Sequence, residues 1–337
     1  MSIFQHIPGI SPQFRAGVGT VLLVAVLLLP LPAAAIEIDN YPALVELIDK
    51  LHDRHGFSKV TLRNWFTQAR IVPEIIEAIT RPKEDLPWHE YRKIFVTEER
   101  TARGVEYWKD NAASLERARR DYGVDPEVIV AIIGVETRYG KNTGRHQVLS
   151  ALATLALEYP RRSEFFRREL EQFLLLAREL KVDPLKIKGS YAGAMGAPQF
   201  MPSSYRHYAV DFDKDGKRDL LANTEDVIGS VANYLKQHGW QPGETITRDL
   251  YIEDWLHVLI RSLQPAMTAD NTVKPVSAAV VAPEAAAVVT LEGEDGPIYR
   301  FGYTNLNVIM RYNTSKRYAM AVFELSQNLR KRYDEAQ

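Results

Sequence analysis

One glutamate lies at the end of an apolar segment. Residues 125–127 (Asp-Pro-Glu) predict a helix start, with an N-cap residue, a proline at the first helical position and an acid in the first turn. The next residues, Val128 to Val135, are all apolar, which indicates a helix buried all round, and Glu136 follows them. Burial should raise the pKa of this carboxyl toward neutrality, so that it can protonate a glycosidic oxygen. The alternative interpretation is a buried glutamate paired with Arg138 or another cation.

A second candidate segment covers residues 188–204, which are rich in glycine, alanine, methionine and proline. It has too many glycines for a helix interior and too few charges for a disordered linker, so it predicts a tight, ordered loop. Ser190, Tyr191 and Gln199 supply hydroxyl and amide groups suited to sugar hydroxyls and acetamido groups. A loop that only packs against the core is the alternative. No nucleotide-binding glycine motif is present.

An acidic segment that begins at Asp211 matches the start of a calcium loop, D-x-D-x-D-G. The twelfth position holds Ala222 where the usual loop has a glutamate, so Glu225 or Asp226 would have to supply the closing carboxylate in a longer loop. We expect a bound calcium ion to brace the structure. A polar turn with aspartates bonded to the backbone is the alternative. The predicted ligands are Asp211, Asp213, Asp215 and Asp219, with the closing residue.

The composition excludes several classes of protein. The chain has 337 residues, of which 46% are hydrophobic and 25% charged, and a formal net charge of −1. Global charge therefore favours neither nucleic acid nor an anionic membrane as a partner, and we expect no nucleic-acid binding. Eight histidines lack the spacing of a metal triad, and the motifs of zinc proteases and serine hydrolases are absent. We expect no organic cofactor.

The pattern predicts a mainly α fold. Apolar residues recur at helical spacing from about residue 41 to 180, and again over 225–238 and 317–334. The least helical stretch, 250–300, indicates short strands and contains an Ala/Val/Pro-rich piece at 275–289 of undecided role. We predict an N-terminal helical region at 36–120, a catalytic core at 121–243 with the calcium loop at 211–226, a small β-containing subdomain at 244–310 and a C-terminal helix at 311–337 that returns to the core.

The first 35 residues predict a secretory signal peptide. Arg15 precedes an apolar run from Val18 to Leu31, and a small-residue triplet stands before Ile36. An uncleaved anchor in the inner membrane is the alternative. The chain has no cysteine, which excludes disulfides and an N-terminal lipid anchor. We therefore expect a periplasmic protein that is not a lipoprotein.

Several motifs together resemble the membrane-bound lytic murein transglycosylase B family (family 3 lytic transglycosylases). The resemblance extends from about Tyr41 to Tyr333, almost the whole mature chain. The motifs are Phe95-Val-Thr97, Ile133-Gly-Val-Glu-Thr-Arg-Tyr-Gly140, Tyr159-Pro-Arg-Arg162, Gly189-Ser-Tyr-Ala-Gly-Ala-Met-Gly196, Gln199-Phe-Met-Pro-Ser-Ser204, Ile228-Gly-Ser-Val-Ala-Asn-Tyr234, Arg311-Tyr-Asn313 and Tyr318-Ala-Met320.

The resemblance implies a lysozyme-like fold in which Glu136 is the only catalytic carboxylate. Such an enzyme cleaves the β-1,4 bond between N-acetylmuramic acid and N-acetylglucosamine in peptidoglycan without water, and leaves 1,6-anhydromuramyl ends. The resemblance also favours Asp226 over Glu225 as the closing calcium ligand. The substrate-binding residues that it implies, added to Tyr191 from the loop pattern, are Tyr91, Arg161, Arg162, Ser190, Gln199, Tyr234, Tyr312 and Tyr318.

Two other functions fit parts of the sequence. A hydrolytic muramidase would add water to the same bond and would need a second carboxylate about 5 to 9.5 Å from Glu136. A calcium-braced peptidoglycan-binding protein would keep the glutamate without using it. In each case the partners are peptidoglycan glycan strands and, as an open expectation, other cell-wall enzymes, and we expect a monomer.

Overall fold

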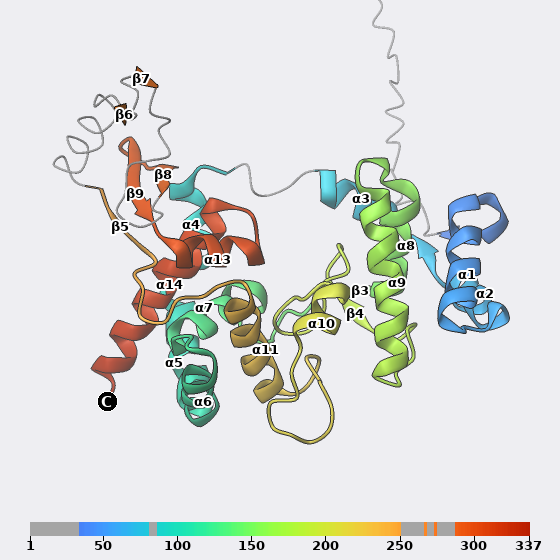
Figure 1. The fold of residues 1–337 in the computed structure, drawn as a ribbon, viewed down its shortest axis with the longest axis horizontal. Helices are drawn as coiled ribbons and strands as arrows, with labels where there is room; N and C mark the ends of the chain where they lie inside the picture. Colours follow the sequence, from blue (N-terminus) through green and yellow to red (C-terminus); the bar gives the residue numbers. More distant parts are fainter. Residues whose placement is uncertain (1–33, 81–85, 251–265, 268–272, 275–286) are drawn as a thin grey trace, which may run out of the picture. The chain divides into compact units, whose positions relative to one another are not determined.

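The computed structural model describes residues 34–80, 86–250, 266–267, 273–274 and 287–337 (Figure 1). The predicted signal peptide lies outside these residues except for its last two, Ala34–Ala35, which form strand β1. Most of the piece at 275–289 also lies outside them. No helix in the described ranges has the length and apolar character that spanning a membrane requires. The prediction of a mainly α fold is confirmed: the strands form only small sheets.

The N-terminal region is helical and rests on the next helix pair. α1 (Pro42–His55) and α2 (Lys59–Gln68) follow the short 3-10 helix η1 (Ile38–Asn40), and α3 (Pro73–Thr80) packs on α8 (Val148–Glu158). Between α2 and α3, strand β2 (Arg70–Ile71) pairs with β1. Hydroxyls of α8 accept hydrogen bonds from the backbone N–H groups of residues 70 and 72, at 3.0 Å each. These bonds satisfy backbone donors and fix this region on α8.

Helix α7 (Pro126–Thr137) is at the centre of the fold. All eight residues from 128 to 135 are buried, as their apolar sequence predicts. Asp125 stands at the N-cap, but its side chain makes no capping hydrogen bond. The helix ends where the next residue, Arg138, adopts a left-handed conformation at φ 52°. Four helices pack around α7 (Figure 1): α5 (Glu98–Asp110), α6 (Ala112–Tyr122), α11 (Thr224–Gln237) and α14 (Lys316–Glu335).

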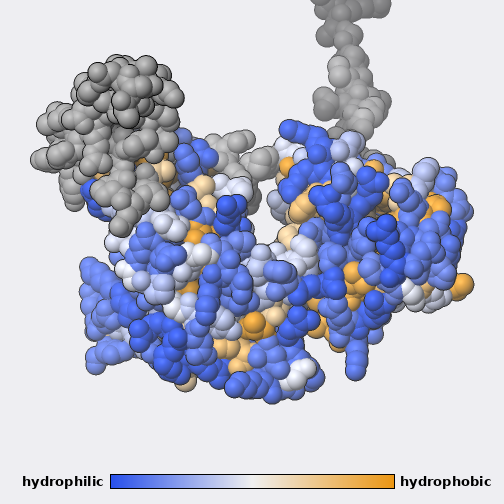
Figure 2. Space-filling model, viewed as in Figure 1, coloured by the Kyte–Doolittle hydropathy of each residue, from blue (hydrophilic) through white to orange (hydrophobic). Residues whose placement is uncertain are grey.

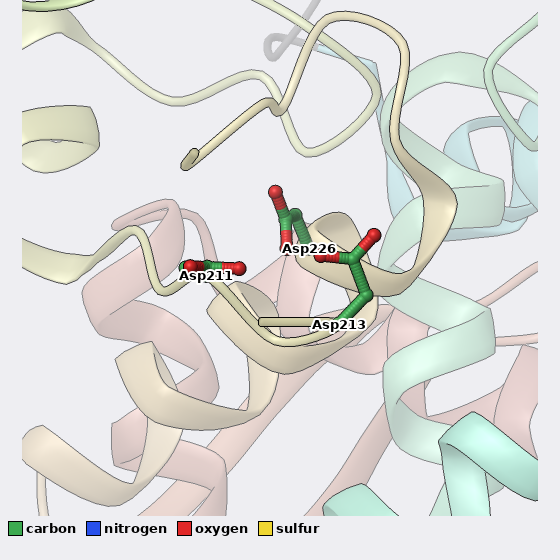
Figure 3. Close-up of side chains that lie close together, drawn as sticks. All are labelled: Asp211, Asp213 and Asp226. Carbon is green, nitrogen blue, oxygen red and sulfur yellow. The ribbon is translucent and has the colours of Figure 1, made fainter. Parts of the chain in front are cut away.

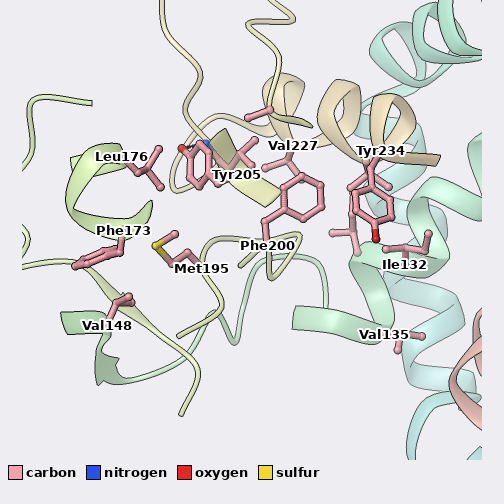
Figure 4. Packing of buried hydrophobic residues seen from close by; sticks show 14 of the residues in the cluster. Ile132, Val135, Val148, Phe173, Leu176, Met195, Phe200, Tyr205, Val227 and Tyr234 are labelled. Atoms are coloured by element: carbon pink, nitrogen blue, oxygen red, sulfur yellow. Dashed lines mark hydrogen bonds between the residues drawn. The ribbon is translucent and has the colours of Figure 1, made fainter. Parts of the chain in front are cut away.

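The glycine-rich segment is an ordered loop joined to a second helix pair. α8 packs against α9 (Ser163–Glu179), the two being linked by the 3-10 helix η3 (Pro160–Arg162). Strand β4 (Lys188–Gly189) pairs with β3 (His146–Gln147), directly before α8. Met195 then bridges to both Gly189 and Phe200, which folds the loop back on itself. Figure 4 shows the buried side chains of Met195 and Phe200 among apolar residues from neighbouring helices, so these two residues anchor the loop in the core.

The segment predicted to contain strands does contain a sheet. β9 (Pro297–Gly302) lies between β5 (Thr247–Asp249) and β8 (Ala287–Glu292), and both pairings are antiparallel. A separate two-residue pair joins β6 (Ala266–Met267) to β7 (Val273–Lys274). The subdomain boundaries themselves stay a prediction.

Two short helices lead from the loop and the sheet into longer ones. α10 (Pro202–Tyr208) contacts α9 and α11, whereas α13 (Thr304–Tyr312) leads into α14. α4 (Trp88–Phe95) contacts α14 and β8. α14 therefore connects the α4 and α13 side of the molecule to the central helix. Figure 2 shows that the described surface on this face is mostly hydrophilic.

Candidate active site

Glu136 occupies the last turn of α7 and is half-buried. Its Oε1 accepts a hydrogen bond of 2.7 Å from the hydroxyl of Tyr318, in the first turn of α14. Burial raises the pKa of Glu136 from 4.5 to about 7, and the hydrogen bond from Tyr318 acts in the opposite direction. A carboxyl with this pKa is protonated in a large fraction of molecules near neutral pH, so it can donate and then recover a proton.

The alternative interpretation, an ion pair with Arg138, finds no support among the described residues. Arg138 is exposed and makes no salt bridge there with Glu136. Nor does any second carboxylate in the described part of the chain contribute to the pKa shift of Glu136. A carboxylate close enough to act as nucleophile would raise that pKa further by repulsion between like charges. Among the described residues, burial and the bond to Tyr318 are thus what sets the pKa of Glu136.

Aromatic side chains continue the site from Tyr318. The ring of Tyr312 lies parallel to that of Tyr318, with centroids 6.4 Å apart, and Tyr234 meets Tyr312 edge-on at 4.9 Å. The hydroxyls of Tyr312 and Tyr234 donate to the carbonyl oxygens of Pro198 and Arg311, at 2.6 Å each. These bonds hold the tyrosines against the glycine-rich loop and α13.

The polar side chains of the glycine-rich loop differ in their hydrogen bonds and in their exposure. Ser190 Oγ accepts the backbone N–H of Ala194 at 3.0 Å, and its hydroxyl proton has no acceptor within the described ranges. Gln199, in the left-handed region at φ 52°, donates its amide N–H groups to the carbonyl oxygens of Thr143 at 3.1 Å and Gly196 at 2.9 Å. Its amide therefore joins two loops. Tyr191 is exposed.

Thr137 is a residue that the sequence reasoning missed. Its Oγ1 donates to the carbonyl of Ala197 at 2.8 Å and accepts the N–H of Gly140 at 3.0 Å. This hydroxyl thus attaches the end of α7 directly to the glycine-rich loop. The sequence shows a threonine next to the glutamate, within the motif Ile133 to Gly140, but this does not identify its hydrogen-bond partner.

The other predicted sugar-binding residues lie in two places. Tyr91 is buried on α4, with its ring 5.0 Å from that of Phe95, and α4 packs against α14, the helix that carries Tyr318. Arg161 and Arg162 are exposed on η3, and the guanidinium of Arg162 lies 4.2 Å from the ring centroid of Phe165. No described contact joins these arginines to Glu136, so their role stays a prediction.

The acidic loop brings three of its five predicted ligands together. Carboxylate oxygens of Asp211, Asp213 and Asp226 lie within 4.8 Å of one another (Figure 3). Asp211 Oδ1 is buried and has no hydrogen-bond partner among the described residues, which is the state expected of an oxygen that belongs to a cation. Asp215 and Asp219 lie outside this group and accept backbone N–H groups of their own loop.

The structure separates the two candidates for the closing carboxylate. Glu225 forms a salt bridge of 2.7 Å with Arg117, whereas Asp226 is fully buried beside Asp213. Burial raises the pKa of Asp226, in opposition to the backbone hydrogen bonds that it accepts. The sequence reasoning missed Asn223, whose side chain donates to Asp213 at 2.7 Å and caps α11. Its position before an acidic first turn is a capping signal.

Tyr318→Phe is expected to raise the pKa of Glu136 further, because the lost hydrogen bond favours the ionised carboxylate. If Glu136 is the proton donor that the sequence predicts, the alkaline limb of the pH–rate profile should move to higher pH. The measurement is kcat/KM for glycan cleavage between about pH 5 and 9. Tyr333→Phe, on the same helix but stacked on Trp108, is the control. An alkaline limb that stays in place would mean that Tyr318 does not tune Glu136.

The mainly helical fold, with a half-buried carboxyl of raised pKa at the end of its central helix, is of the lysozyme-like class. Comparison with known proteins gives the family. The family described as "Transglycosylase SLT domain" matches residues 40–327, and the chain belongs to it. The protein is a peptidoglycan lytic transglycosylase.

Individual relatives agree with this assignment. The chain is 40% identical, over 86% of its length and 82% of the relative's, to the membrane-bound lytic murein transglycosylase B of Escherichia coli K12. It is 42% identical to the soluble lytic transglycosylase SltB1 of Pseudomonas aeruginosa, with a TM-score of 0.74 and coverage of 86% of this chain and 99% of that one.

Solved structures that match the chain include complexes with two different ligands. The Escherichia coli lytic transglycosylase Slt35, at 38% identity, has a structure in complex with bulgecin A and another in complex with calcium. The TM-scores are 0.76 and 0.75, and each match covers 90% of this chain and 97% of that one.

Proposed function

We propose that Glu136 is the single acid/base of this transglycosylase. The observation that carries the proposal is a half-buried carboxyl with a pKa of about 7, bonded to Tyr318 and with no second carboxylate acting on it in the described structure. As acid, Glu136 protonates the oxygen between N-acetylmuramic acid and N-acetylglucosamine, and the glycosidic C–O bond breaks. The acetamido oxygen of the substrate stabilises the positive charge at the muramyl anomeric carbon.

In the second step the ionised Glu136 removes the proton from the 6-hydroxyl of the same muramyl residue. The 6-oxygen then bonds to the anomeric carbon, which gives the 1,6-anhydro ring and returns the proton to Glu136. No water enters, so the substrate supplies both nucleophiles. A pKa near 7 suits both steps, because the group must give a proton and take one at the same pH.

The sugar site consists of the residues around this carboxyl. Tyr312 is partly exposed and offers an aromatic surface that suits a sugar ring, and the buried Tyr234 and Tyr318 belong to the proposed site behind it. Ser190 offers a hydroxyl proton to the acetamido or hydroxyl groups. Gln199 shapes the loop through its two carbonyl contacts. The remaining members of the proposed site are Tyr91, Tyr191, Arg161 and Arg162, of which the arginines suit the carboxylates of the cell wall.

The acidic loop holds a structural calcium ion in this proposal. Three clustered carboxylates, an orphaned buried oxygen of Asp211 and the calcium complex of Slt35 support it. Asp211, Asp213 and Asp226 would be ligands, and Asp215 and Asp219 would join them when calcium binds. The ion neutralises clustered negative charge and braces the segment before α11; it takes no part in the proton transfers.

We place the enzyme in the cell envelope, where its substrate lies, after export by residues 1–35 as signal peptide or anchor. The membrane-bound relative from Escherichia coli supports this location.

Mass spectrometry of digested peptidoglycan tests the proposed chemistry. The mature protein should release products with 1,6-anhydromuramyl ends, and Glu136→Gln should release none above background. Products one water heavier, with reducing ends, would instead establish a hydrolytic muramidase with a base elsewhere. Binding to peptidoglycan without soluble products from either protein would indicate a binding module.

A further inference from the structure

A basic cavity lies beside the catalytic helix and outside the proposed sugar site. Its volume is about 260 Å³, and it is bounded by the end of α4, the first turns of α5 and the residues just after α7. This volume is below the range of about 300–1,000 Å³ that encloses drug-sized ligands, so it suits a small group. The basic side chains that line it are Lys93, Arg100, Arg103 and Arg138, and the acidic one is Glu99.

Arg100 is a buried cation in the wall of this cavity. It is only 7% exposed, and its Nη1 is buried without a hydrogen-bond partner in the described part of the chain. Burial is the main cause that lowers the pKa of Arg100, and the charge of Arg138 adds to it. A buried guanidinium N–H without an acceptor is costly. An oxyanion in the cavity would screen the guanidinium groups of Arg100 and Arg138 from each other.

The other charges leave the cavity positive. Glu99 pairs with Arg103 at 3.0 Å, but it is 73% exposed, so that bond is weak. Glu98, its neighbour, pairs with Arg332 instead. Arg138 has no salt bridge among the described residues. One carboxylate therefore faces four cations.

The turn that ends α7 builds this cavity next to Glu136. Arg138 follows the catalytic residue by two positions, and both it and Tyr139 adopt left-handed conformations, at φ 52° and 62°. The hydroxyl of Tyr139 donates to the carbonyl of Arg100 at 2.8 Å, which ties α5 to the turn. Glu136 itself does not line the cavity, so a group bound there would belong to a part of the substrate other than the bond that Glu136 protonates.

We propose that this cavity binds a carboxylate of the peptide carried by the glycan strand. The inference rests on the proposed function, since it concerns the same substrate. Guanidinium groups bind carboxylates through paired, charge-assisted hydrogen bonds. Ile94, which is 39% exposed, and the ring of Tyr139 add apolar surface for an amino-acid side chain. The cavity thus makes the enzyme prefer peptide-bearing glycan.

The test compares three substrates: peptide-bearing glycan strands, the same strands stripped of peptide by an amidase, and strands whose peptide carboxyls have been converted to amides. Initial rates of anhydromuramyl product formation are measured for the wild-type protein, Arg103→Gln and Lys109→Gln. Lys109 is exposed on the same helix and does not line the cavity, so it is the matched control. Arg103→Gln removes one cation from the cavity without emptying the buried position of Arg100.

Wild type and Lys109→Gln should cleave peptide-bearing glycan faster than stripped or amidated glycan. In Arg103→Gln the ratio of the rate on peptide-bearing glycan to the rate on stripped glycan should fall by about tenfold. Binding of the peptide-bearing strands by Glu136→Gln, compared with Glu136→Gln/Arg103→Gln, should show the same loss without turnover.

Equal rates on all three substrates, or an equal loss of rate on all three in Arg103→Gln, would overturn the inference. So would inhibition of wild type by inorganic phosphate to the same extent on stripped and peptide-bearing strands, since the site would then bind free oxyanions. Anhydro products from the wild type would support the proposed function in each case.

Discussion

Glu136→Gln is expected to lower the rate of glycan cleavage by about 1,000-fold, because glutamine can neither donate a proton to the glycosidic oxygen nor accept one from the 6-hydroxyl. The shape of the side chain is kept, so substrate binding should change little and the loss should fall on kcat. The measurement is the initial rate of anhydromuramyl product formation. Glu127→Gln is the matched control: the same change at the other end of α7, where Glu127 pairs with Arg330 at 2.7 Å. A variant at Glu136 that keeps a tenth of the wild-type kcat would exclude it as the acid/base.

The same substitution should change stability in a way that depends on pH. The folded state raises the pKa of Glu136 from 4.5 to about 7, so between these values the folded protein binds a proton more tightly than the unfolded chain. The resulting stabilisation is fully present below the unfolded pKa and is lost as the pH rises through 7. Above that, the buried negative charge costs up to about 3 kcal/mol relative to an unperturbed carboxyl.

Glutamine never ionises and avoids this cost. Thermal denaturation should therefore give Glu136→Gln a higher Tm than wild type at about pH 8 and a similar Tm at about pH 4. A difference in Tm that is the same at both pH values would show that burial does not raise this pKa. Together with the loss of kcat, the expected result describes a residue whose burial serves chemistry at the expense of stability.

The sequence predicted the part of the site that depends on local pattern. An apolar run after Asp-Pro-Glu is enough to place Glu136 at the end of a buried helix, because helix start and burial are both local signals. Similarly, alternate aspartates before a glycine predicted the loop that gathers Asp211 and Asp213. These inferences needed no knowledge of how distant segments meet.

What the sequence left open depends on those distant contacts. Tyr318 meets Glu136 across 182 residues, and only the resemblance to the family, not spacing, brought the two together. Spacing alone could not choose between Glu225 and Asp226; the salt bridge of Glu225 with Arg117, from another helix, separates them. The basic cavity at Arg100 was not predicted at all, since its cations come from three segments and look like solvated helix faces in the sequence.

Asp226→Ala is expected to lower the free energy of unfolding by about 3 kcal/mol, because one buried and one partly buried backbone donor lose their acceptor at once. The two carboxylate oxygens of Asp226 accept the backbone N–H groups of Phe212 and Asp219, at 2.7 Å each. The residue is fully buried, so water does not replace these bonds. Chemical denaturation with the wild-type protein as reference measures the difference. A loss below about 1 kcal/mol would mean that the loop does not depend on this carboxylate.

The response of the Tm to calcium should distinguish the role of Asp226 from that of Glu225. An ion that binds only the folded protein stabilises it by about 2.7 kcal/mol at a concentration 100 times its Kd, so a chelator should lower the Tm of the wild-type protein. Asp226→Asn removes the negative charge that closes the ligand set, and its Tm should not respond to the chelator. Glu225→Gln, one residue earlier on the same helix turn, loses its salt bridge with Arg117 but should keep the full calcium response. If Glu225→Gln lost the calcium response and Asp226→Asn kept it, the closing ligand would be Glu225. If neither calcium nor the chelator changed the Tm of the wild-type protein, the three clustered carboxylates would form a turn held by backbone hydrogen bonds alone.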